Sequence, residues 1–434
     1  MSDTRNRRFA RESGFTLLEV TVALLTVVIV LLGVLALFDF TNRVSRVQTH
    51  VADMQQGLRI SQLEVERIVR MAGRGGLPTT NVAPGGAIWV ANNVPDNTTI
   101  GGAGTPEVSA GTDVLTLRGT FDTPIYQIDN RGGAGSLIYR DNNGQITTNP
   151  AQAVRGVLLV NAVSPTQIPQ SLEPLRLAIQ AGVPEALMLV NWVSPGVYAV
   201  VELDPANSGV AGNQATLAFR ISGTPLAAAY ARLSPNGVFP AAMTSVAFAS
   251  LVEEHRFYIR EVDGFAPRLT RARTLPATEI AYGPAGGPNN ANNWALDVTD
   301  NVLDLQVALG LDTQNHVPRP RAPGEPNEPP NLTTIAADPV NGYISEAADG
   351  EDDDWLFNSA DDNRADAVWL NTLPYYMRLT FLVRTERPDP AVYQAPSLAT
   401  LEDRVYPANH PFNSAVDRRY RRRAVQTVIN LRNL

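Results

Sequence analysis

The apolar positions near the start of the chain form one long run that contains no proline. Between residues 15 and 40 nearly every side chain is apolar, and the interruptions are Gly33, the acids Glu19 and Asp39, and a few threonines. A membrane-spanning helix needs about 20 consecutive apolar residues. Residues 15–40 are therefore predicted to form the membrane-spanning half of a helix.

Beyond residue 40 the apolar positions recur at steps of three and four, which places them on one face of an α-helix. This stripe consists of Val44, Val47, Val51, Met54, Leu58, Ser61, Val65, Ile68 and Ala72. Glycines from residue 73 onward and Pro78 end the pattern. Residues 41–76 are therefore predicted to continue the same helix as an amphipathic half. The whole helix would have roughly 60 residues and a length of about 85 Å.

After residue 77 the pattern changes to short apolar runs separated by Gly, Pro and Asn. The predicted strands are 114–118, 157–161, 186–193, 196–203, 216–221, 246–252, 255–260, 302–309, 376–385 and 424–431. Several of these alternate between apolar and polar residues, as Leu303, Leu305 and Val307 do with Asp304 and Gln306. Such alternation is typical of antiparallel strands with one buried and one solvated face. The predicted fold class is α+β, with the long helix packed on an antiparallel sheet.

Residues 77–434 are predicted to form one β-rich globular head with long loops. Three loops stand out: residues 81–111 are rich in Asn and Gly, residues 317–331 are rich in proline, and residues 343–366 are strongly acidic. Loops of this length are usually functional or disordered. With 44% hydrophobic residues among 434, the chain can form a substantial core.

Charge and cysteine content narrow the function further. The net charge is −8, and without the four arginines and two acids of residues 1–14 it becomes −10. An acidic chain is poorly suited to bulk nucleic-acid binding. The arginines before the apolar run predict a cytoplasmic N-terminus, with everything after residue 40 on the other side of the membrane. The chain has no cysteine and therefore no disulfide or thiolate metal site.

Glu19 is the residue that a simple membrane anchor does not explain. A carboxylate inside an apolar span costs on the order of a few kcal/mol, and such a residue is a functional candidate by default. A secretory signal peptide has a shorter apolar core and a small-residue cleavage site after it, and neither is present here. A plain anchor fits the length of the run but leaves Glu19 without a role.

The string from Gly14 to Glu19, Gly-Phe-Thr-Leu-Leu-Glu, resembles the type III signal of type IV pilins and of type II secretion pseudopilins. The resemblance implies a leader at 1–14, cleavage by prepilin peptidase between Gly14 and Phe15, and N-methylation of Phe15. It also implies that Glu19 meets the N-terminal amine, that of a neighbouring subunit, during filament assembly. A charge in an apolar medium needs such a partner.

Weaker similarities extend along the chain and resemble the PilW-type minor pilins. They lie at 111–119, 185–190, 255–260 with 267–271, 300–312 and 421–433. This resemblance implies a pilin-like fold and a subunit that primes filament assembly and sits at the pilus tip. The implied partners are other minor pilins, the major pilin, the assembly platform in the inner membrane and the lipid bilayer. The head would be periplasmic first and then exposed at the cell surface, with roles in adhesion or motility.

Two alternatives stay open. The chain could be a J-type pseudopilin of type II secretion, although those are generally far shorter. The head could also be an adhesive binding module that a pilin stalk displays. The sequence contains no motif for nucleotide binding or nucleophilic catalysis. We therefore expect a structural protein without catalytic residues.

The acidic loop is the candidate metal site. Asp349, Glu351, Asp352, Asp353 and Asp354 provide the oxygen ligands that Ca²⁺ prefers. Their spacing is not that of an EF-hand, and a solvated acidic loop is the alternative. No other cofactor is expected.

Two basic features have similar alternatives. The arginines between residues 418 and 423 could contact nucleic acid, or they could flank a final strand and form salt bridges with the acidic surface. The four histidines, His50, His255, His316 and His410, are far apart in the sequence and are treated as isolated.

Overall fold

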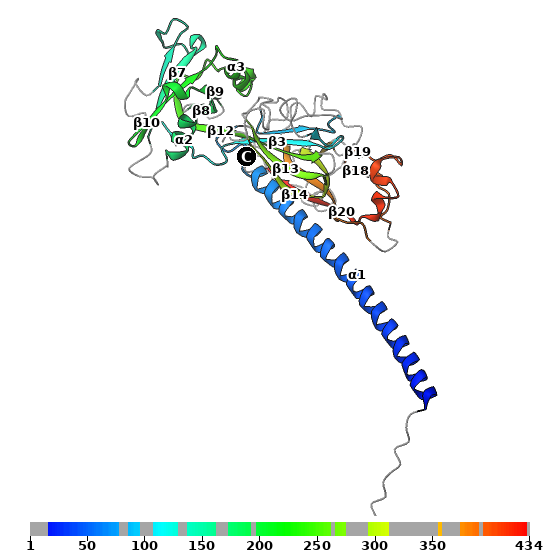
Figure 1. Cartoon of the computed structure of the whole chain (residues 1–434). Coiled ribbons are helices and arrows are strands. Elements are labelled where there is room, and N and C mark those ends of the chain that lie inside the picture. Colours follow the sequence, from blue (N-terminus) through cyan, green and yellow to red (C-terminus); the bar gives the residue numbers. More distant parts are fainter. Residues whose placement is uncertain are drawn as a thin grey trace, which may run out of the picture.

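The computed structural model describes residues 16–77, 86–95, 107–128, 137–161, 172–191, 197–261, 265–274, 294–311, 355–357, 374–389 and 394–431. One long helix, α1 (Leu17–Val69), extends from a head that consists mainly of β-strands (Figure 1). Every strand pair in the described residues is antiparallel. The predicted α+β fold with a long N-terminal helix is therefore confirmed.

Helix α1 has 53 residues and is about 80 Å long. The large apolar side chains between residues 17 and 40 are 44–86% exposed, whereas Leu58, Val65 and Ile68 are buried against the head. The helix thus has the predicted two halves. Its predicted end at residue 76 is wrong, because residues 70–76 form turns in which several glycines adopt a positive φ. Glycine takes that conformation without steric cost.

The part of the head next to α1, here called the proximal lobe, has two sheets. The first contains β1 (Ile88–Ala91), β2 (Glu107–Val108), β3 (Val114–Gly119), the second half of β12 (Val246–Glu261), β13 (Arg268–Thr274) and β14 (Trp294–Asp300). The second has the order β16 (Trp355–Leu356), β15 (Val302–Leu311), β17 (Pro374–Arg384) and β20 (Arg422–Asn430).

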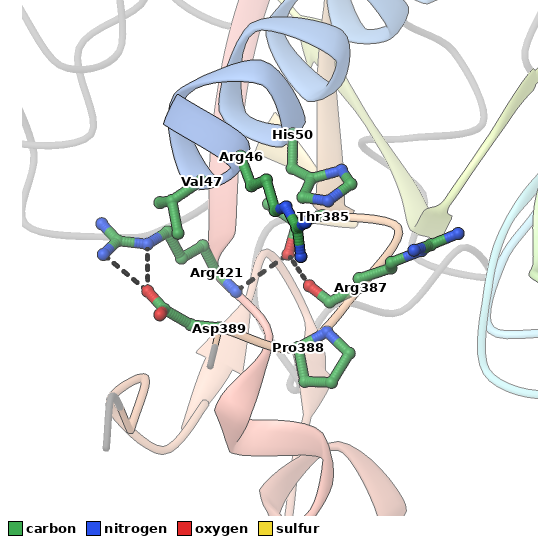
Figure 2. Close-up of a pocket in the computed structure, with 8 residues that line it drawn as sticks. All are labelled: Arg46, Val47, His50, Thr385, Arg387, Pro388, Asp389 and Arg421. Atoms are coloured by element: carbon green, nitrogen blue, oxygen red, sulfur yellow. Dashed lines mark hydrogen bonds and ion pairs between the residues drawn. The ribbon is translucent and has the colours of Figure 1, made fainter. Parts of the chain in front are cut away.

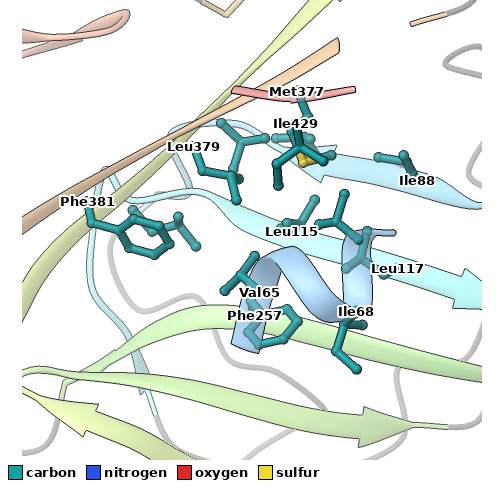
Figure 3. Packing of buried hydrophobic residues seen from close by; sticks show 14 of the residues in the cluster. Val65, Ile68, Ile88, Leu115, Leu117, Phe257, Met377, Leu379, Phe381 and Ile429 are labelled. Atoms are coloured by element: carbon teal, nitrogen blue, oxygen red, sulfur yellow. The ribbon is translucent and has the colours of Figure 1, made fainter. Parts of the chain in front are cut away.

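The buried stripe of α1 joins the two sheets of the proximal lobe. Figure 3 shows Val65 and Ile68 of the helix beside Leu115 and Phe257 of the first sheet, with Leu379 of the second sheet nearby. Full burial of one such aliphatic side chain stabilises a fold by about 1.5–3 kcal/mol. The C-terminal half of α1 is therefore part of the core of the head.

The rest of the head, here called the distal lobe, has its own core. It contains the short helices α2 (Glu173–Ala181) and α3 (Pro225–Ala231) and the first half of β12. Its other strands are β4 (Tyr126–Gln127), β5 (Leu137–Arg140), β6 (Ile146–Thr147), β7 (Arg155–Asn161), β8 (Ala186–Asn191), β9 (Tyr198–Leu203), β10 (Gly209–Ala211) and β11 (Gln214–Arg220). Figure 1 shows this lobe on the far side of the head from most of α1.

Short 3-10 turns and one small hairpin complete the described head. The turns are Pro150–Gln152, Pro205–Asn207, Pro235–Gly237, Pro411–Asn413 and Asp417–Arg419. The hairpin consists of β18 (Thr400–Leu401) and β19 (Arg404–Val405). Each predicted strand overlaps an observed one, and two of them fall in the same strand, β12; the other boundaries differ by a few residues.

The prediction of two strands at 246–252 and 255–260 is wrong, because β12 is continuous. The two acids between the predicted strands, Glu253 and Glu254, are buried and paired with basic side chains. Arg118 of β3 contacts Glu254 at 2.5 Å, and Arg256 contacts the same carboxylate at 2.8 Å. The first half of β12 pairs with β8 and the second half with β3, so this strand links the two lobes.

Several other elements were not predicted. The loop predicted at 81–111 contains β1 and β2, and the acidic loop contains the short strand β16. Strands β5 and β14 and helices α2 and α3 are also additional, while β13 overlaps the segment 267–271 that only the family resemblance had indicated. These segments are short or carry charges, as β13 does with three arginines, so the apolar pattern did not reveal them.

The prediction that β15 and β17 have a solvated polar face is wrong. Asp304, Gln306, Arg378 and Thr380 are all buried. The β18–β19 hairpin accounts for this, since its side chains reach this face of the sheet. Glu402 accepts hydrogen bonds from Arg378 Nη2 at 2.6 Å and from Thr380, and Arg404 lies 2.9 Å from Asp304. Strand β20 has the predicted alternation. Ile429 is buried, whereas Gln426 and Asn430 on the opposite face are exposed.

Candidate functional site

The N-terminal end of α1 carries the predicted assembly residue. Glu19 and Thr16 form a capping box, in which each side chain bonds the backbone of the other residue. The Thr16 N–H donates to Glu19 Oε2 at 2.9 Å, and the Thr16 hydroxyl donates to the same oxygen at 3.0 Å. In the described residues no hydrogen bond to Glu19 Oε1 is present. The predicted cleavage residues Gly14 and Phe15 lie outside the described residues.

The apolar half of α1 has the properties of a membrane span. It is long and apolar enough to cross a bilayer, and none of its most apolar part is buried in the protein. Thr21 and Thr26 donate their hydroxyl protons to helix carbonyls at 2.8 Å, so these polar groups are satisfied within the helix. Asp39 is paired with Arg43 at 2.6 Å. Glu19 is thus the one acid in the apolar run that lacks a basic partner among the described residues.

A charged cluster lies where α1 meets the first sheet. Arg271 of β13 donates to Glu64 of α1 at 2.6 Å and to His255 Nδ1 at 3.3 Å. Partial burial opposes ionisation of Glu64, but hydrogen bonds from Arg67 and Arg271 lower its pKa. Burial lowers the pKa of His255, and Arg271 lowers it further. The cluster fixes α1 on the head and requires a neutral imidazole at His255.

Asp122, Glu253 and His255 bring three potential metal ligands together, with ligand atoms within 4.8 Å of one another. The histidine is therefore not isolated, contrary to the prediction. Arg273 lies 3.2 Å from Glu253, and Arg271 contacts His255. These two guanidinium groups already supply the positive charge that a metal ion would bring. The geometry therefore favours an ionic network that holds the strands together.

The predicted calcium ligands, Asp349 and Glu351 to Asp354, lie outside the described residues. Of the histidines, His316 also lies outside them, while His410 packs its ring against Tyr406. His50 lies at the junction between α1 and the head.

Two members of the C-terminal arginine cluster form salt bridges within the head. Arg421 contacts Asp389 at 2.7 Å, and Arg422 contacts Asp417. Arg418 donates to the Ala395 carbonyl at 2.7 Å. These contacts favour the structural alternative over nucleic-acid contact for the three arginines.

No protein-family model, curated protein or solved structure matches this chain. The described residues themselves show a capped helix tip that carries Glu19, an exposed apolar span and a large β-rich head.

Proposed function

We propose that this chain is a minor pilin of the PilW type, which takes part in priming and assembly of a type IV pilus and is located at the filament tip. The proposal rests on the resemblance of the Gly14–Glu19 string to the prepilin signal. The observation that carries it beyond the sequence is the Glu19 carboxylate at the tip of an exposed apolar helix. The proposed role is structural and involves no catalytic residue.

The capping box gives Glu19 a specific part in this role. Thr16 occupies one carboxylate oxygen, Oε2, and keeps the side chain at the first turn of the helix. The other oxygen is available to a second partner. The proposed partner is the methylated α-amine of Phe15 in a neighbouring subunit, which prepilin peptidase exposes by cleavage after Gly14. Pairing the two charges removes the cost that each would have in lipid.

The size of the head agrees with a position at the tip. A filament formed by packed helices has to accommodate every head along its surface, whereas a subunit at the end has no subunit stacked above it. The two-lobed head lies at the C-terminal end of α1, and its distal lobe extends beyond the end of the helix (Figure 1). The subunit would first be anchored in the inner membrane, with the leader in the cytoplasm and the head in the periplasm.

The test is Glu19→Val in cells that assemble the pilus. We expect normal membrane insertion and a mature N-terminus at N-methylated Phe15, measured by mass spectrometry. We also expect a loss of at least roughly tenfold in incorporation into filaments, since an unpaired amine in lipid costs several kcal/mol. Incorporation is measured by quantifying the subunit in purified pili.

Asp39→Asn is the matched control, because it removes the other acid of the apolar segment, which already pairs with Arg43. The control should retain incorporation. Normal incorporation of the Glu19→Val variant would contradict the assigned role of Glu19. An unprocessed N-terminus in the wild-type chain would refute the pilin proposal as a whole.

A further inference from the structure

A pocket lies at the point where α1 enters the head. Its volume is about 170 Å³, and it is formed by Arg46, Val47 and His50 of the helix together with the segment after β17 and Arg421 (Figure 2). We propose that this pocket binds the headgroup of an anionic membrane phospholipid. The inference rests on the proposed function only in requiring that the apolar half of α1 spans a membrane.

The charges around the pocket favour an anion. Arg421 uses Nε and Nη2 to bind one oxygen of Asp389, at 2.9 and 2.7 Å, so that this buried acid is neutralised. Arg46 and Arg387 remain as excess positive charge. Among the described residues, the salt bridge of Arg387 is to Glu386, at 3.9 Å with both side chains largely exposed. An exposed ion pair at that distance contributes little stabilising free energy. Arg387 can therefore leave Glu386 and turn toward a phosphate.

His50 adds a polar atom that has no protein partner. Its Nδ1 is buried and makes no hydrogen bond within the described residues. In Figure 2 the imidazole lies beside Arg46 and above the segment that carries Arg387. An imidazole nitrogen can donate to a phosphate oxygen. The pocket is therefore lined by two arginines without a strong acidic partner and one histidine, from two different elements.

A second pocket, which His50 also lines, provides an internal comparison. It has a volume of about 190 Å³ and includes Asp53, Asp300 and Glu386. Its arginine, Arg384, already pairs with Asp417 at 2.5 Å. Acidic residues outnumber basic ones in the lining of the second pocket, although Asp300 contacts Arg268 at 3.0 Å. The Arg46 pocket is therefore the one suited to an anion.

The position of the pocket along α1 favours a lipid headgroup over a free anion as the ligand. Arg46 lies six residues beyond the apolar run, about 9 Å along the axis. Helix side chains tilt toward the N-terminus, which here means toward the membrane. The polar layer of a bilayer adds about 5–8 Å on each side of its hydrocarbon core. The guanidinium of Arg46 therefore reaches the depth of lipid phosphates.

The test titrates the full-length chain in detergent with phosphatidylglycerol or phosphatidylcholine and counts bound lipid by native mass spectrometry. We expect the wild type to prefer phosphatidylglycerol. Arg46→Gln with Arg387→Gln should weaken that binding by about 25-fold, as each basic residue near an anionic surface contributes roughly fivefold. Arg46→Lys with Arg387→Lys keeps the charge and should retain most of the preference.

Arg59→Gln with Arg232→Gln is the charge-matched control, because both arginines are exposed and lie outside the pocket. Equal loss in both Gln double variants, or no lipid preference in the wild type, would overturn the proposal. Displacement of the lipid by inorganic phosphate at equal concentration would also overturn it. Membrane insertion is measured separately by alkaline extraction of vesicles, so failure of the membrane anchor is distinguishable from failure of this site.

Discussion

Charged side chains inside the head are held by partners from other elements. Glu254 is buried between two arginines, and Asp113 accepts backbone N–H groups from Asn93 at 2.8 Å and Val307 at 2.7 Å. Burial raises the pKa of Asp113, while it lowers the pKa of His255. Buried ionisable groups of this kind make stability depend on pH.

His255 gives a prediction with a defined sign. Its pKa in the folded chain lies below the ordinary value of about 6.5. The unfolded chain therefore binds more protons below that pH, and stability falls as the pH decreases through this range. Replacement His255→Gln should remove this component, which is at most about 1.4 kcal/mol per pH unit. Thermal unfolding of the full-length chain between pH 7 and pH 5 measures the slope for both proteins.

The variant can be less stable than the wild type at pH 7, because it loses the contact with Arg271. The difference between the two pH slopes still reports on His255, because the buried carboxylates titrate in both proteins and contribute to both slopes. Identical slopes would show that His255 does not titrate in this way.

At the scale of the element, α1 combines two kinds of surface in one continuous helix. The first half exposes large apolar side chains on every side, whereas the second half buries one stripe between the sheets. Gly57 permits close approach of α1 to strand β14, because a Cβ on residue 57 would lie 2.7 Å from Thr299 Oγ1. Gln62 also bonds Thr427 of β20 at 2.6 Å. The helix is thus fixed to both sheets.

Two aliphatic residues of α1, one buried and one exposed, test the packing of the helix on the head. Ile68 is 1% exposed in the proximal core, so Ile68→Ala should lower the free energy of unfolding by about 2–5 kcal/mol. Leu63 is 66% exposed, so Leu63→Ala should change it by no more than about 0.5 kcal/mol. Denaturant unfolding of the full-length chain in detergent measures both. Equal effects would mean that this half of α1 does not pack on the head as described.

At the scale of the whole molecule, the head consists of two lobes with separate cores. The proximal core includes α1 and both sheets next to it, and the distal core lies among β7, β8, β9 and β11. Strand β12 passes through both lobes, and a smaller cluster around Met188 and Tyr230 lies between β8, β9 and α3. The distal lobe can therefore be perturbed without direct contact with α1.

Gly156 tests this independence. It pairs with Phe219 across β7 and β11, and a Cβ there would lie 2.2 Å from the phenyl ring. Gly156→Ala should destabilise the distal lobe by about 1–3 kcal/mol through overpacking. Hydrogen exchange should accelerate in β7 and β11 but not in β17 or the second half of α1. Uniform acceleration throughout the head would show that the lobes unfold as one unit.

Gly209→Ala is the matched control in the neighbouring strand β10. No atom lies within 4 Å of the added Cβ, and exchange should stay unchanged.

The sequence by itself determined the elements whose signal is local. The apolar run, the three-and-four spacing after residue 40 and the alternating strands predicted α1 and most of the longer strands, because burial of one face imposes a fixed period on the chain. The capping box was not predicted, although Thr16 stands only three residues before Glu19.

Tertiary structure alone decided which polar residues are buried and what they contact. Asp304 and Gln306 were predicted to be solvated, yet a hairpin about 100 residues later covers them. The Glu64–Arg271–His255 contacts and the Arg46 pocket likewise join residues that are distant in the sequence. Hydrophobic periodicity reports which face a residue lies on, but a pairing between two charged side chains has no period, and it exists only once the chain has folded.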